Sequence, residues 1–181
     1  MNEDSLSAFI DRVRAKWSVD SADLVEHCRT ALASLTLSPT AEPWLAELLS
    51  ELPASRELHR DQAEGFMLLA HAEEKGLFRP PHDHGRSWVV YAVQSGELEV
   101  RTYRKVPDQD GKPYLVQSNL SVLRPGFAEA YLPGDIHDTR CLSDPALLFR
   151  FTAMDLRRED QVERRVTRFV ERDGHWTVPG Q

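Results

Sequence analysis

Hydrophobic residues recur at helical spacing through the first 52 residues of the chain. The first stripe repeats at intervals of three and four residues over 6–17. A second stripe follows Ser21, a candidate N-cap, and covers 24–35, and a third runs over 40–52. We therefore expect three amphipathic helices in residues 1–52. Such helices could bury one another or cover the face of a sheet.

Beyond residue 52 the pattern changes to short apolar runs separated by turn residues. Runs that favour strands cover 65–72, 87–93, 98–106, 114–123, 128–132, 146–152, 166–170 and 175–178. The charged segment 155–163 is expected to be a helical turn or an exposed loop. Many short strands with almost no helix between them indicate an all-β barrel or sandwich. We expect one β-domain over residues 53–181, with the helical segment 1–52 packed on it.

Composition and charge exclude several classes of protein. The formal net charge is −7, whereas non-specific binding to nucleic acid or to an anionic membrane requires a basic surface. The amino-terminal residues are acidic and amphipathic, unlike a secretory signal, and no apolar run is long enough to span a bilayer. The two cysteines, Cys28 and Cys141, make no disulfide framework. We expect a cytoplasmic protein, a monomer or a homodimer, with a small-molecule substrate.

The candidate chemistry lies in the stretch "RPPHDHGRSWVVYAV". His82 and His84 are two residues apart, so on an extended chain both side chains point the same way. His137, just after a Pro-Gly turn, is the best candidate for a third ligand. Imidazole suits iron, zinc, copper and nickel. A lone His-x-His pair is weak evidence, and we expect four other histidines to be exposed or incidentally hydrogen-bonded: His27, His59, His71 and His175.

The glycines around these histidines give the pair a context. Gly76 precedes His82 in a G-x5-H-x-H pattern, and Gly126 and Gly134 precede His137 in a G-x7-G-x2-H pattern. The two patterns, on a chain of short strands, resemble the two sequence motifs of the cupin superfamily. This resemblance implies a double-stranded β-helix, or jelly-roll, barrel with His82, His84 and His137 as metal ligands.

The usual cupin motif has a glutamate three to five residues after its second histidine, and this chain has none there. Those positions are Ser87, Trp88 and Val89. The remaining site has three neutral ligands, so a bound metal would keep its full positive charge. Such a site should accept an anionic substrate and leave positions open for O2. Fe(II) fits this chemistry best, and Zn, Ni, Mn and Cu are the alternatives.

A three-histidine cupin with helices before its barrel resembles the cysteine dioxygenase family of thiol dioxygenases. The resemblance covers residues 54–179, including the approach to the His-x-His pair and the tail "VTRFVERDGHWTVP". It implies oxidation of a small thiol to a sulfinate by O2. It also implies that Arg56 binds a substrate carboxylate, because Arg56 falls without a gap where the family has that arginine.

The chain departs from this family at two places. Val89 stands where many members have a cysteine that crosslinks to a tyrosine. The family's Ser-x-His-x-Tyr relay aligns with Leu148, Arg150 and Thr152, none of which matches. These departures favour a divergent three-histidine oxygenase. A non-enzymatic cupin that binds metal or a small molecule, and a three-histidine dioxygenase that cleaves C–C bonds, are the alternative functions.

The catalytic residues stay open, with Arg56, Tyr91 and Arg150 as candidates. Arg60 could compete with Arg56 for a carboxylate, and either could instead be a surface arginine. Arg150 alternates within the apolar run "ALLFRFTAM", so it faces either the interior of the barrel or solvent. Tyr91 could replace the missing relay tyrosine or simply pack in the core. We expect Asp83 and Asp138, each beside a histidine, to hold turns and not to bind metal.

Overall fold

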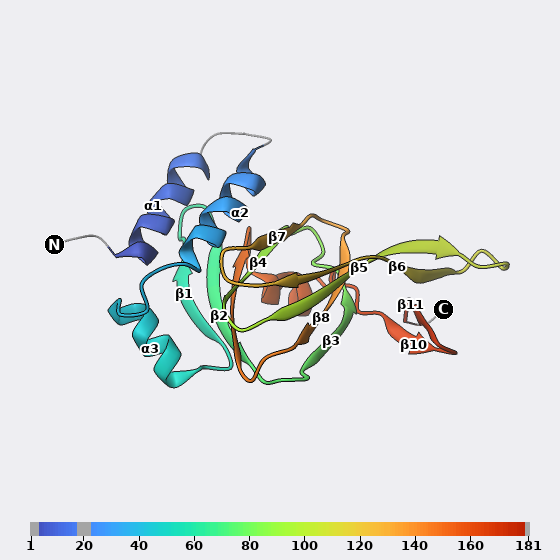
Figure 1. The fold of residues 1–181 in the computed structure, drawn as a ribbon. Helices are drawn as coiled ribbons and strands as arrows, with labels where there is room; N and C mark the ends of the chain where they lie inside the picture. Colours follow the sequence, from blue (N-terminus) through green and yellow to red (C-terminus); the bar gives the residue numbers. More distant parts are fainter. Residues whose placement is uncertain (1–3, 18–22, 180–181) are drawn as a thin grey trace.

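The computed structural model describes residues 4–17 and 23–179. Helix α1 spans Ser5–Trp17, α2 spans Leu24–Leu35 and α3 spans Pro43–Glu51, which confirms the three helices expected from the sequence. Ser21, the expected N-cap, lies outside the described residues. The helices lie beside the first sheet (Figure 1). Their buried apolar residues form one core cluster with residues of that sheet. Within the described ranges, no helix has the length and apolarity needed to cross a membrane.

The rest of the chain forms short antiparallel strands. These strands are β1 (Arg56–Arg60), β2 (Met67–Glu73), β3 (Phe78–His82), β4 (Val89–Ser95), β5 (Leu98–Pro107), β6 (Pro113–Leu123), β7 (Ala128–Tyr131), β8 (Ile136–Cys141), β9 (Ala146–Thr152), β10 (Val170–Arg172) and β11 (His175–Thr177). The first sheet has the order β1-β2-β9-β4-β7, and the second has the order β10-β11-β6-β5-β8-β3. The two sheets face each other in a double-stranded β-helix of cupin type, so the expected fold class is confirmed (Figure 1).

Central strands of the first sheet are apolar on both faces. Phe149 and Phe151 of β9 pack toward the helices, whereas Leu148 packs between the sheets with Val89 and Tyr91 of β4. Because side chains alternate along a strand, a strand that is buried on both faces reads as a continuous apolar run. This explains the runs "WVVYAV" and "ALLFRF". In such a strand, alternate residues face the helices and the residues between them face the barrel interior.

Three strands were not among those expected from the sequence. They are β1, β3 and β8, and two of them carry histidines of the candidate site. Conversely, the expected strand over 166–170 is mostly irregular, with one isolated bridge between Arg168 and His82 before β10 begins. The charged segment 155–163 contains a π-helical turn, η1 (Arg158–Val162). Its Glu159 is only 2% exposed, which an exposed loop would not show.

Candidate metal centre

The structure brings His82, His84 and His137 together at one point between the sheets. His82 is the last residue of β3 and is paired in register with His137 of β8, while His84 lies in the loop that follows. The candidate ligand nitrogens of the three residues all lie within 4.8 Å of one another. The Nε2 atoms of His84 and His137 are 3.3 Å apart. Three imidazoles from two strands and a loop therefore converge as a metal site requires.

The hydrogen bonds of these rings fit metal ligation. Nδ1 of His82 lies 2.9 Å from the carbonyl oxygen of Pro80. A carbonyl only accepts, so Nδ1 of His82 carries the proton and its Nε2 keeps a lone pair for a metal. Nδ1 of His137 is buried without a hydrogen-bond partner. Two ligand atoms that each lie about 2.1 Å from one ion are about 3.0–3.4 Å apart when the ligand–metal–ligand angle is between 90° and the tetrahedral angle. The separation of the two Nε2 atoms of His84 and His137 falls in this range.

The surroundings favour the neutral form of these imidazoles. Burial lowers the pKa of both His84 and His137 well below the usual range, and the neighbouring rings lower it further. Burial also lowers the pKa of His82. Neutral imidazole is the form that binds metal. These residues fit a divalent transition metal of the kind that accepts nitrogen ligands, and no carboxylate belongs to the group.

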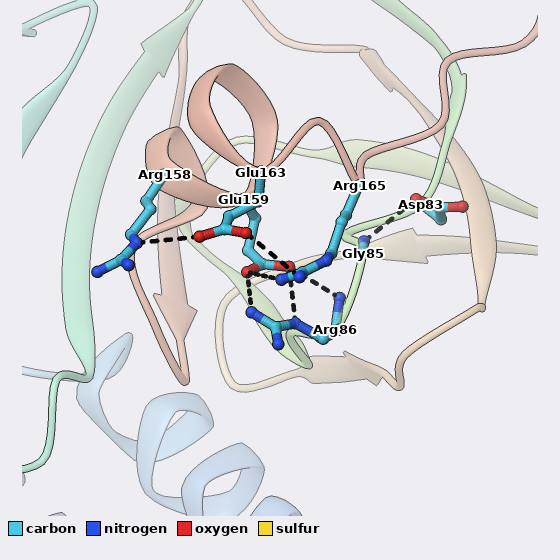
Figure 2. Close-up of polar contacts among 7 residues, drawn as sticks. All are labelled: Asp83, Gly85, Arg86, Arg158, Glu159, Glu163 and Arg165. Atoms are coloured by element: carbon cyan, nitrogen blue, oxygen red, sulfur yellow. Dashed lines mark hydrogen bonds and ion pairs between the residues drawn. The ribbon is translucent and has the colours of Figure 1, made fainter.

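The loop that carries His84 is held by two carboxylates (Figure 2). Oδ1 of Asp83 accepts hydrogen bonds from the backbone N–H groups of Gly85, at 3.1 Å, and Thr167, at 2.8 Å. Asp83 thus holds the turn, as expected. From η1, Glu159 accepts hydrogen bonds from Arg86 through its backbone N–H, at 3.2 Å, and through Nη2, at 2.9 Å. The histidine loop is therefore fastened to the segment that follows the last long strand.

Gly85 allows this close approach of the loop to η1. Its φ is +61°, and a Cβ added there would lie 3.0 Å from Oε2 of Glu159 and 3.1 Å from Cβ of Arg165. Another residue at this position would be strained by the backbone conformation and crowded by the buried carboxylate. Glu159 was not singled out from the sequence. It lies in a run of charged residues, and nothing in that run distinguishes the buried carboxylate from the exposed ones.

A cavity of about 660 Å³ opens onto His82 and His84. Its walls come from both sheets and from the segment around η1, and His137 lies behind it with 0% of its surface exposed. Tyr91 faces this cavity, and its ring centroid is 5.4 Å from that of His137. Arg150 also lines the cavity, together with Leu148 and Thr152 of the same strand. Two of the three candidate catalytic residues, Tyr91 and Arg150, therefore line the cavity that opens onto His82 and His84.

Arg56 does not reach this cavity. It is ion-paired with Glu47, at 3.0 Å, and with Glu51 of α3, on the helical side of the sheet. A bulge shifts the register of β1 between Glu57 and His59, so Glu57 and Arg60 both face the cavity although they are three residues apart. Spacing along the sequence cannot reveal such a bulge. The resemblance implied that Arg56 binds a substrate carboxylate. In the structure, Arg56 is instead ion-paired with two carboxylates of α3.

Comparisons with known proteins found solved structures that are similar to parts of this chain. No protein-family model and no curated protein matches the chain. TT1209 from Thermus thermophilus is 26% identical, with 59% of this chain and 93% of that chain covered and a TM-score of 0.43. KdgF from Halomonas sp. is 19% identical, with coverage of 60% and 83% and a TM-score of 0.44. An L-ribose isomerase from Acinetobacter sp. DL28 is 20% identical, with coverage of 54% and 57% and a TM-score of 0.42.

Proposed function

We propose that this protein is an Fe(II)-dependent dioxygenase that oxidises a small thiol to a sulfinate. The observation that carries the proposal is the convergence of three imidazoles, without a carboxylate in the group, beside a cavity that His82 and His84 line. The motif resemblance to the thiol dioxygenases supports the same reaction. Iron held by His82, His84 and His137 would supply the redox chemistry that lets O2 react with sulfur.

The residues around the three histidines suit this role. His137 and His84 are 0% and 4% exposed, so water has little access to the inner side of the site. Burial raises the pKa of Tyr91, which keeps its phenol protonated and able to donate a hydrogen bond to a bound oxygen or sulfur atom. The reaction is balanced without another reductant or oxidant, because both atoms of O2 enter the product: RSH + O2 gives RSO2H.

The test is O2 consumption by the Fe(II)-loaded protein with a panel of small thiols, with products identified by mass spectrometry. The proposal predicts thiol-dependent O2 uptake and a product that contains both oxygen atoms of labelled O2. His84→Ala should abolish this uptake, and His175→Ala, which removes an exposed histidine outside the site, should leave it unchanged. If the iron-loaded protein oxidises no thiol, the reaction proposed here is wrong. Metal binding without turnover would indicate a binding protein, and cleavage of a diketone would indicate the C–C-cleaving alternative.

A further inference from the structure

The cavity is rich in arginine although the chain is acidic. Five arginines line it, and three of these are neutralised by carboxylates on its wall. Arg60 is paired with Asp155 at 2.9 Å, Arg79 with Glu73 at 2.9 Å, and Arg168 with Asp160 at 2.5 Å. The other two are Arg150 and Arg157, for which no carboxylate lies within ion-pair distance among the described residues. Arg157 is exposed to water, whereas Arg150 is half-buried.

Arg150 lies at the centre of the first sheet and faces inward. It is in register with Leu69 of β2 on one side and with Tyr91 of β4 on the other. Its Nε atom is buried without a hydrogen-bond partner. Burial lowers the pKa of His71 to about 4, and the positive charge of Arg150 is the next largest cause. Burial raises the pKa of Tyr91, and the charge of Arg150 opposes that rise. The guanidinium therefore acts on the part of the cavity next to the three histidines.

A cation in this position is costly in the absence of a ligand. Removing a charge from water without a partner destabilises a fold, and natural proteins almost always pair or hydrogen-bond such charges. Three further cavity-lining residues have a buried polar atom without a hydrogen-bond partner: Nε2 of His71, Oγ1 of Thr152 and Oε2 of Glu73, whose other carboxylate oxygen is paired with Arg79. The charge of Glu73 is matched by that of Arg79, whereas the charge of Arg150 has no carboxylate within ion-pair distance among the described residues. A ligand that carries one negative charge would satisfy it.

We propose that Arg150 is the anion-binding residue of this cavity, and that it binds the carboxylate of a small ligand whose other end reaches the three histidines. The planar guanidinium matches a carboxylate through paired N–H groups. Of the two arginines without a carboxylate partner, only Arg150 is half-buried, and one such charge suits a monoanion better than a phosphate dianion. The reaction at the other end of the ligand rests on the proposed function. The binding of the carboxylate by Arg150 does not depend on that reaction.

The experiment measures binding to the Fe(II)-loaded protein without O2 by calorimetry. The probes are 3-mercaptopropionate, its uncharged counterpart 3-mercapto-1-propanol, and propionate, which lacks the thiol. The wild-type protein should bind the carboxylated thiol more tightly than the alcohol. Arg150→Met should reduce that affinity about tenfold to a hundredfold and abolish the preference. Arg150→Lys should restore part of it, because an ammonium keeps the charge but not the paired geometry.

Arg157→Met is the matched control, because it removes the same charge from the exposed part of the same wall. It should keep the preference for the carboxylate. Arg150→Met without ligand should melt at or above the temperature of the wild-type protein, since it removes a half-buried charge that no carboxylate neutralises. A lower melting temperature would indicate a structural arginine and overturn the proposal. An unchanged preference in Arg150→Met, or an equal loss in Arg157→Met, would also overturn it.

The outcomes separate this proposal from the proposed reaction. If propionate binds in an Arg150-dependent manner but no thiol is oxidised, the anion site stands and the dioxygenase proposal is wrong. If thiols are oxidised but Arg150→Met turns over carboxylated and neutral thiols with wild-type ratios, the dioxygenase proposal stands and Arg150 is not the anion-binding residue.

Discussion

Asp61 joins the first helix to the barrel through one buried carboxylate. Nε of Arg14 on α1 donates a hydrogen bond to it at 2.6 Å, and the backbone N–H groups of Ala63 and Glu64 donate to its other oxygen at 2.9 Å each. The Asp61 side chain is 4% exposed. These bonds, first to the N–H of Glu64 and then to Arg14, lower the pKa of Asp61 to about 2.

The depressed pKa of Asp61 predicts how stability falls in acid. The folded-state pKa lies below the ordinary value of 3.8, so the stabilisation is complete above that value and is lost as the pH falls from there toward about 2. Asp61→Ala should lower the free energy of unfolding at neutral pH by about 1–3 kcal/mol and flatten this acid loss. Urea unfolding at several pH values would measure it. Asp11→Ala, at an exposed carboxylate 3.7 Å from the same arginine, should change little, and equal effects of the two variants would contradict the assignment.

At the scale of elements, η1 contacts the loop that carries His84. Glu159 of η1 contacts the backbone and side chain of Arg86, two residues after His84 (Figure 2). Arg165 lies 3.5 Å from the same carboxylate. A polar group that fixes the residues around a metal ligand contributes to metal affinity without touching the ion.

Glu159→Gln should therefore weaken metal binding. We expect a loss of about tenfold to a hundredfold in affinity, measured by competition for Co(II) against a chelating dye. The amide keeps the size of the side chain but loses the charge that faces two arginines. Glu163→Gln is the control, because Glu163 also contacts Arg165, at 3.2 Å, but does not contact the histidine loop. Wild-type affinity in Glu159→Gln, or an equal loss in both variants, would show that η1 does not position the site.

Elements also show where sequence patterns suffice and where they do not. The helices and the long strands have apolar periodicity, which predicts them. β3 contains Pro80, Pro81 and His82, and β8 reads "IHDTRC", so neither has the alternation that indicates a strand. The spacing of glycines and histidines nevertheless grouped the three ligands of the candidate site. The bulge in β1 and the burial of Glu159 depend on contacts far apart in the chain. The family resemblance therefore implied that Arg56 belongs to the site, and the sequence pattern did not reveal Glu159.

At the scale of the whole molecule, the barrel has a core that does not depend on a metal. One cluster lies between the helices and the outer face of the first sheet, and another lies between the two sheets. Phe66, Phe149 and Phe151 are fully buried in the first of these. Such apolar burial stabilises a domain of this size without help from a bound ion.

Removal of the metal should lower the melting temperature without unfolding the protein. A ligand at a hundred times its dissociation constant stabilises the folded state by about 2.7 kcal/mol, which corresponds to a shift of about 5–10 °C for a chain of this length. Differential scanning calorimetry with and without a chelator would measure the shift, and circular dichroism would report the fold. Loss of the fold on chelation at room temperature would mean that the metal is structural.

The central claim is that His82, His84 and His137 together hold a metal ion, and metal analysis of purified variants tests it most directly. The wild-type protein and His175→Ala should each carry about one divalent transition metal ion per chain, as expected for one set of three imidazole ligands. His82→Ala, His84→Ala and His137→Ala should each lose the ion while remaining folded by circular dichroism. Full retention of the metal in any two of these three variants would contradict the account.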